Sequence, residues 1–245
     1  MPAIKFDTRT VLIVIAVYGL VAYLLLPTLW RRHERLPNLS ERPLITRTGA
    51  DIPGDPMNVG MIGSKEDLIH AFAAAGWQPA DSITLRSSIA IGISVVLRRP
   101  DPDAPVSSLY YEHRKQDLAF EREVGKSADQ RHHVRFWQLA DKDETGRDIW
   151  LGAATFDRGV GFSHDTGQIT HHIDGDLDVE RAFLIGTLEE AKRLADQFFV
   201  AGIGPTVNGR NGGGDRYFTD GRIAFGVLTA DATSSGLNPP KSPAP

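Results

Sequence analysis

Two histidine pairs are the residues of this chain best suited to chemistry. One lies in Arg131–Trp137, which reads Arg-His-His-Val-Arg-Phe-Trp, and the other in Ile169–Asp174, which reads Ile-Thr-His-His-Ile-Asp. Histidine changes charge near neutral pH and is the commonest metal ligand in proteins. Between the pairs runs Trp150–Asp157, which adds a carboxylate. The grouping therefore points to acid–base or metal chemistry.

All three segments are short and rich in aromatic and β-branched residues, which predicts β-strands. Side chains alternate between the two faces of a strand, so each histidine pair is divided between opposite faces. If the three strands are neighbours, the polar, outward faces bring together one set of residues: His133, Arg135, Thr155, Asp157, His172 and Asp174. The other two histidines, His132 and His171, fall on the apolar side and are expected to be core residues.

The outward set allows two kinds of chemistry. A divalent metal ion could bind His133, His172 and Asp174, which would leave Arg135 to meet a phosphate or carboxylate of a ligand. The same set, with Asp157, could instead perform acid–base catalysis, with a carboxylate orienting each imidazole. Ordinary ion pairs across a sheet surface would explain these residues without any function. No metal motif of recognised spacing, such as His-Glu-x-x-His, is present.

Other motifs can be excluded. Asp174-Gly-Asp-Leu-Asp178 has the spacing of a calcium loop, but Val179 and Ile185 occupy the positions where that loop needs glycine and glutamate. The glycine cluster at 209–214 lacks the Gly-Lys-Ser/Thr of a phosphate loop, and we expect a hairpin connection there. No Gly-x-Ser-x-Gly elbow of a serine hydrolase occurs.

Composition narrows the class of protein. Of the 245 residues, 41% are hydrophobic and 24% are charged, which is typical of a globular domain with a real core. The net charge is -4 and no basic run occurs, so we expect no nucleic-acid partner. The chain has no cysteine, which excludes disulfides, thiolate catalysis and cysteine-bound zinc.

The N-terminal region predicts a membrane anchor. After a short flank at 1–10, residues 11–30 are uncharged and almost wholly apolar, long enough for a transmembrane helix. Trp30 suits the membrane interface. A cleaved signal peptide would have a shorter core and a small-residue cleavage site, whereas Trp-Arg-Arg follows here. Arg31, Arg32 and Arg35 outnumber the preceding basic residues, which favours a cytoplasmic C-terminal domain.

The rest of the chain divides into three parts. Residues 31–60 are rich in proline and glycine and predict an extended linker. Residues 61–230 form the expected globular domain. Residues 231–245 are rich in serine, proline and alanine, which predicts a disordered tail.

Within the domain, the pattern predicts the α+β class: a largely antiparallel sheet with helices packed on one face, preceded by the N-terminal transmembrane helix. Ser64 and Asp67 form the signature of a helix start, and Gly76 ends that helix. Further helices are expected at 82–98 and 178–198. The expected strands are 107–111, 117–121, 132–139, 149–157, 168–173 and 222–228.

Several joint motifs resemble one known family. They are Asp55–Gly63, Ala75–Trp77, Ala104–Tyr110, Arg114–Phe120, Arg131–Trp137, Trp150–Asp157, Thr170–Asp174, Glu180–Arg181 and Phe218–Arg222, in that order. Together they are similar to the LssY C-terminal domain family. The resemblance implies a bacterial, membrane-associated protein, and the family's label implies a link to type I secretion. No catalytic mechanism comes with it, so no residue role is carried over.

Two functions therefore remain open. The first is a single-pass protein of the bacterial inner membrane that acts as an accessory component of envelope transport or type I secretion, with the bilayer and envelope or secretion proteins as partners. The second is a metal-assisted or His/Asp acid–base hydrolase, or a ligand-binding domain, that acts on an anionic substrate such as a phosphorylated lipid or envelope component. Its site would comprise His133, Arg135, Asp157, His172 and Asp174, and its cofactor would be a divalent metal ion.

Overall fold

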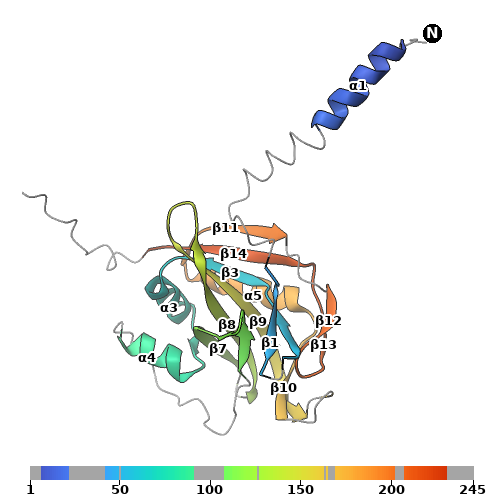
Figure 1. The fold of residues 1–245 in the computed structure, drawn as a ribbon. Coiled ribbons are helices and arrows are strands. Elements are labelled where there is room, and N and C mark those ends of the chain that lie inside the picture. The colour runs from blue at the N-terminus through green and yellow to red at the C-terminus, as the bar shows by residue number, and fades with distance from the viewer. Residues whose placement is uncertain are drawn as a thin grey trace, which may run out of the picture. The chain divides into compact units, whose positions relative to one another are not determined.

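The computed structural model describes residues 7–21, 42–49, 51–90, 108–125, 127–162, 164, 169–201 and 207–230. The chain divides into two compact units, Met1–Glu41 and Arg42–Pro245. The first contains helix α1 (Thr8–Leu20), at whose start the Asp7 carboxylate accepts a hydrogen bond from the Thr10 amide (Figure 1). The end of the expected span, at 22–30, lies outside the described residues, as does the expected tail. Within the described residues, no helix is both long and apolar enough to cross a membrane.

The described part of the second unit is built on one large mixed sheet. Across it the strands run β11 (Leu194–Ala201), β14 (Arg222–Leu228), β3 (Val59–Ile62), β9 (Asp148–Phe162), β8 (Ser127–Lys142), β7 (Leu118–Val124) and β4 (Gln78–Pro79). An additional strand, β10 (Ile169–Ile173), pairs with the far half of β9. Only the β14–β3 pair among these is parallel. The expectation of a largely antiparallel sheet is confirmed.

Helices α3 (Lys65–Ala74) and α5 (Leu177–Glu190) pack on one face of this sheet, as expected from the sequence. The Ser64 hydroxyl accepts a hydrogen bond from the Asp67 amide, and the Asp67 carboxylate accepts one from the Ser64 amide, so the expected helix start is confirmed. Phe72 of α3 stacks on Phe120 of β7 at 4.6 Å between ring centres. A third helix, α4 (Ser82–Ala90), covers the first part of the helix expected at 82–98, and the remainder lies outside the described residues.

The opposite face of the large sheet is covered by a second, smaller sheet. Its strands run in the order β2 (Pro53–Pro56), β1 (Ile45–Thr48), β5 (Leu109–Tyr111) and β6 (Arg114–Lys115). In Figure 1, β1 lies in front of the β8–β9 region and α5 lies behind it. Trp137 of β8 joins the layers, because its indole N–H donates to the Arg114 carbonyl at 3.0 Å. The described part of the unit therefore has three layers: helices, large sheet and small sheet.

Two expectations about elements are wrong. The linker expected at 31–60 holds strands β1 and β2 and the first half of β3 in its second part, which the structure includes in the folded unit. Four-residue strands are too short to show a two-residue period, and the prolines of β2 sit at an edge strand, where their missing N–H is tolerated.

The helix expected at 178–198 ends at Glu190 instead. Lys192 adopts a left-handed conformation, with φ of 55°, which turns the chain, and Leu194–Ala201 then pairs with β14 as strand β11. Leu194 packs against the same core as the apolar side of α5. The helical spacing of apolar residues therefore continues through the sequence to Leu194, although the backbone changes from helix to strand. The glycine cluster, by contrast, lies at the turn of a hairpin, β12 (Asn208–Arg210) and β13 (Arg216–Phe218), as expected.

Candidate functional site

The register of β8 and β9 brings three of the candidate residues together. His133 lies opposite Thr155, and Arg131 lies opposite Asp157. Arg135 shares their face by alternation. This face was expected to point outward, and that expectation is wrong: His133, Arg135 and Asp157 are only 1%, 7% and 3% exposed. They are buried because the small sheet covers this side of the large one.

His133 is held as a neutral imidazole. Its Nδ1 lies 3.8 Å from Oδ2 of Asp157, and its Nε2 has no hydrogen-bond partner among the described residues. Burial, reinforced by the charge of Arg135, lowers the pKa of His133 to about 4, against the favourable effect of Asp157. At neutral pH the ring is therefore uncharged, with one nitrogen unprotonated.

Asp157 keeps its negative charge despite being buried. Burial by itself would raise the pKa of Asp157, but the neighbouring His133 and His171 rings and the charge of Arg135 outweigh burial and lower the pKa below its usual value. The Thr155 hydroxyl also donates to Asp157 Oδ1 at 3.5 Å. His133 and Asp157 thus form a neutral base beside a fixed carboxylate.

Arg135 pairs with a residue that the sequence reasoning missed. Its Nη1 lies 3.6 Å from Oδ2 of Asp55, in β2 of the small sheet, and both side chains are buried. Burial raises the pKa of Asp55, as do the charges of Asp157 and Asp215, while Arg135 opposes them. Asp55 fell in the expected linker, and its position at the start of the Asp55–Gly63 motif was the one signal that marked it.

His171 belongs to this polar side as well, although it was expected in the apolar core. Its Nε2 lies 2.8 Å from Nη2 of Arg131, whose Nη1 is 3.0 Å from Oε2 of Glu121. The pairing of β10 with β9 is irregular here: His172 pairs with Gly159 and Ile173 with Asp157, so Arg158 is skipped and a simple two-residue alternation does not hold.

His172 and Asp174 have partners other than those expected. His172 Nδ1 lies 2.8 Å from Oδ1 of Asp215, which follows the glycine cluster and was not a sequence candidate. Asp174 accepts a hydrogen bond from the Asp176 amide at 3.1 Å, in the turn that precedes α5. The structure thus gives the three expected metal ligands separate partners: His133 has Asp157, His172 has Asp215, and Asp174 has a backbone amide.

A different set could hold a metal ion. One ligand atom each from His164, His172 and Asp215 lies within 4.8 Å of the others. His164 Nε2 is 3.8 Å from the same Asp215 oxygen that His172 contacts. Within the part of the chain that the structure describes, this is the one such group.

Together these side chains form three contact groups whose charges act on one another, and we call the whole set the interlayer network. It comprises Asp55, Glu121, Arg131, His133, Arg135, Asp157, His171, His172 and Asp215. Its four carboxylates face two guanidinium groups, so with neutral histidines the network has a formal excess of two negative charges. The excess negative charge of the network favours a bound cation.

The remaining histidine of the first pair, His132, serves the helix layer. Its Nδ1 lies 2.7 Å from Oε2 of Glu180 in α5, and its ring stacks on Phe183 at 3.7 Å between centres. Because both partners belong to α5, this contact holds the helix against β8. It is a further histidine–carboxylate pair, on the opposite face of the sheet from His133.

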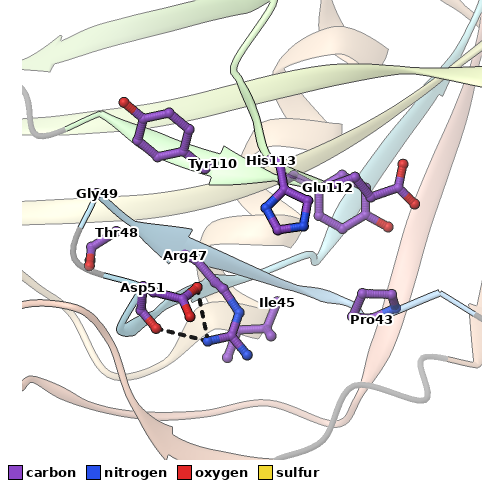
Figure 2. A pocket seen from close by; sticks show the side chains of 10 residues that line it. Pro43, Ile45, Arg47, Thr48, Gly49, Asp51, Tyr110, Glu112 and His113 are labelled. Atoms are coloured by element: carbon purple, nitrogen blue, oxygen red, sulfur yellow. Dashed lines mark hydrogen bonds and ion pairs between the residues drawn. The ribbon is translucent and has the colours of Figure 1, made fainter.

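A surface groove of about 600 Å³ lies on the small sheet, apart from the interlayer network. Figure 2 shows that Arg47 turns back onto Asp51, where its Nη1 meets the Asp51 carbonyl and carboxylate at 2.8 and 3.4 Å. None of the network residues lines it; the lining is Pro43, Ile45, Arg47, Thr48, Gly49, Asp51, Tyr110, Tyr111, Glu112 and His113. The side chains of Arg47, Asp51 and Glu112 are 50%, 81% and 40% exposed, so water screens their charges. We therefore place the candidate site in the buried network.

The comparison with known families agrees with the motifs. The model of the family described as LssY C-terminus matches residues 34–223, which include every residue of the interlayer network. No curated protein matches the chain, and no solved structure matches it. The match spans well over half of the chain, so this protein belongs to the LssY C-terminus family.

Proposed function

We propose that this domain performs general acid–base chemistry, most simply the hydrolysis of an anionic substrate, at the interlayer network. The observation that carries the proposal is the arrangement of His133, whose Nε2 has no hydrogen-bond partner among the described residues while its Nδ1 lies beside Asp157. A base needs a nitrogen that is free and unprotonated, and a carboxylate on the other nitrogen to orient the ring. His133 has the unprotonated nitrogen, and its Nδ1 lies 3.8 Å from the Asp157 carboxylate, too far for a hydrogen bond but close enough for the negative charge to act on the ring.

In this mechanism, His133 Nε2 removes a proton from a water molecule as that water attacks the substrate. The negative charge of Asp157 stabilises the imidazolium that forms, and the ring then returns the proton to the leaving group. Side-chain exposure rises from 1% at His133, through 13% at Arg131, to 25% at His172. The substrate would therefore enter from the His172 end of the network.

The test compares two histidine variants in a hydrolysis assay with a phosphomonoester, a phosphodiester and a carboxylic ester. His133→Asn keeps a side-chain nitrogen near the position of Nδ1, facing Asp157, but removes Nε2. We expect it to lower turnover by about 10²- to 10⁴-fold, the usual contribution of a general base. His132→Asn is the matched control, because it removes the neighbouring imidazole on the opposite face, and it should change turnover little.

Circular dichroism and melting curves would establish that both variants are folded. Absence of turnover by the wild-type protein on all three substrates would contradict the proposal. So would a His133→Asn protein that turns over at the wild-type rate.

A second candidate function is a tethered accessory role in envelope transport or type I secretion at the bacterial inner membrane. The specific observation that favours a tether is helix α1, whose apolar side chains are exposed on all sides: Leu12, Val14, Ile15 and Tyr18 are 60–63% exposed. A helix that is hydrophobic all round is stable when a bilayer or a partner surrounds it. The family name supports the secretion role, and the basic residues after residue 30 favour a cytoplasmic domain.

Membrane fractionation tests the tether. The full chain should stay with membranes after alkaline carbonate washing, and a variant without residues 1–35 should be released. Release of the full chain would contradict the tether. Pull-downs with the full chain should recover envelope or transport proteins, and recovery of none would count against the accessory role.

A further inference from the structure

The rim of the interlayer network contains a group of side chains with the donor atoms of a transition-metal site. His164, His172 and Asp215 supply two imidazoles and one carboxylate, with ligand atoms within 4.8 Å of one another. A tetrahedral zinc ion with ligands at about 2.0–2.1 Å would hold its donor atoms roughly 3.4 Å apart. The distances of 2.8 and 3.8 Å from Asp215 Oδ1 to His172 Nδ1 and His164 Nε2 lie on either side of that value.

The carboxylate of this group is fixed in place by the surrounding backbone. Asp215 Oδ2 accepts a hydrogen bond from the Ile173 amide at 3.0 Å, which leaves Oδ1 directed at the histidines. The Asn211 side chain holds the loop before it, because its Oδ1 accepts hydrogen bonds from the Gly213 and Asp215 amides at 3.0 and 2.9 Å. The same loop binds the backbone of His164, because the His164 amide donates a hydrogen bond to the Gly213 carbonyl at 2.9 Å. One turn therefore positions two of the three donors.

The third donor, His172, is accommodated by a glycine. A Cβ atom on Gly161 of β9 would lie 2.5 Å from His172 Nε2, so only glycine leaves room for the ring in this position. The ring planes of His164 and His172 have centres 5.1 Å apart and are inclined by 42°. The two imidazoles are thus neighbours without being stacked face to face.

Charge and exposure both suit a cation with an open coordination position. The network carries a formal excess of two negative charges, and Asp55 is close enough to Asp215 for the two charges to interact. The side chains of Asp215, His172 and His164 are 7%, 25% and 62% exposed, so the site runs from a buried carboxylate to solvent. Catalytic zinc sites likewise have three protein ligands and leave one position to water or substrate.

We propose that His164, His172 and Asp215 bind one divalent transition-metal ion, of the zinc class, at the rim of the interlayer network. Imidazole nitrogen favours such ions over magnesium and calcium, which prefer oxygen ligands throughout. A catalytic role for this metal ion rests on the proposed function. The guanidinium groups of the network are already paired with carboxylates, so a metal ion would supply the positive charge that faces an anionic substrate.

The test is direct metal binding by the full chain in detergent, purified without a polyhistidine tag and stripped with a chelator. Zinc chloride is titrated in by calorimetry, with magnesium chloride in a parallel titration. We expect one Zn²⁺ per chain and no binding of Mg²⁺. With Co²⁺ as the probe, visible absorption should report a site with nitrogen and oxygen ligands.

Two exposed histidines give a matched comparison. His164→Ala should weaken Zn²⁺ binding at least 10- to 100-fold. Loss of a residue that only hydrogen-bonds to a metal ligand already has an effect of this size, and His164 would be a ligand itself. His113→Ala, an exposed histidine on the small sheet, should leave binding unchanged. Since both side chains are exposed, neither variant is expected to affect folding.

Several results would overturn the inference. They are no Zn²⁺ uptake by the wild-type protein, equal uptake by His164→Ala, or equal losses in both variants. Hydrolysis that persists in chelated protein without Zn²⁺ uptake would overturn the metal site and leave the proposed function standing. Stoichiometric Zn²⁺ binding that is lost in His164→Ala, in a protein without turnover, would support the metal site and contradict the hydrolase.

Discussion

The side chain of Asn58 and the backbone of Ala154 exchange two hydrogen bonds. Asn58 Nδ2 donates to the Ala154 carbonyl at 2.9 Å, and its Oδ1 accepts from the Ala154 amide at 2.8 Å. Asn58 is only 1% exposed and stands between β2 and β3. The Asn58 side chain thus provides hydrogen-bond partners for the backbone of β9 just beyond the residues of β9 that pair with β3. It also fixes the position of β2, which carries Asp55, relative to β9.

Asn58→Ala should therefore be strongly destabilising. It leaves the amide and carbonyl of Ala154 buried without these partners, and each such group costs about 1–3 kcal/mol. We expect the free energy of unfolding to fall by about 2–4 kcal/mol in urea titrations. Asn208→Ala, at an exposed asparagine, should change it by no more than about 0.5 kcal/mol. A loss below about 1 kcal/mol at Asn58 would show that the two bonds are not important.

Stability should decline in mild acid because of His133. Its folded-state pKa of about 4 lies below its ordinary value of 6.5, so the unfolded chain binds a proton more readily between these values. The contribution of His133 to the free energy of unfolding is therefore fully present above pH 6.5. It is lost as the pH falls towards 4, by an amount on the order of 3 kcal/mol.

The measurement is the difference in unfolding free energy between the wild-type protein and His133→Asn from pH 7 to 4.5. The difference cancels groups common to both proteins, such as Glu121, where burial raises the pKa and gives the opposite trend. The wild-type protein should lose more stability over this range than the variant. Parallel curves would mean that His133 titrates normally.

Breaking one side of the Arg135–Asp55 pair should cost more than removing both charges. Arg135→Met leaves Asp55 buried near Asp157 without its cation, a change that typically costs about 3–5 kcal/mol. Adding Asp55→Asn to that variant should restore part of the loss. The exposed pair Arg47–Asp51 is the control, where Arg47→Met should cost less than about 1 kcal/mol. A double variant less stable than Arg135→Met alone would be evidence against a buried ion pair.

Two glycines should respond in opposite directions to alanine. A Cβ atom on Gly152 of β9 would lie 2.5 Å from the Phe136 ring and 2.8 Å from Val59, so Gly152→Ala should cost about 1–3 kcal/mol by overpacking. On Gly186, inside α5, a Cβ atom would meet no heavy atom within 4 Å apart from its chain neighbours and the backbone of its own helix. Gly186→Ala should stabilise the protein by about 0.5–1 kcal/mol, because alanine favours the helix. Melting temperatures would check both, and a rise for Gly152→Ala would contradict the packing.

Patterns that depend on neighbours along the chain could be read from the sequence. The Ser64–Asp67 pair predicts the start of α3 because both of its hydrogen bonds are local. The alternation in 132–139 and 149–157 predicts strands β8 and β9, and it correctly groups His133, Arg135 and Asp157. Local sequence patterns did not predict the end of α5, because the left-handed conformation of one residue, Lys192, turns the chain there. They also did not predict β1 and β2, because these strands are too short to show a two-residue period.

The partners of the site residues were decided by the tertiary structure. Asp55 and Asp215 lie 80 and 43 positions from Arg135 and His172, and no period in the sequence connects them. The face expected in solvent is buried because residues 45–56 and 109–115 form a sheet over it, a pairing between distant segments. The pairing of β10 with β9 is irregular at Arg158, and His171 lies against Arg131 instead of in the apolar core. Sequence periodicity reports which side chains share a face, whereas long-range strand pairing determines what covers that face and what each side chain meets there.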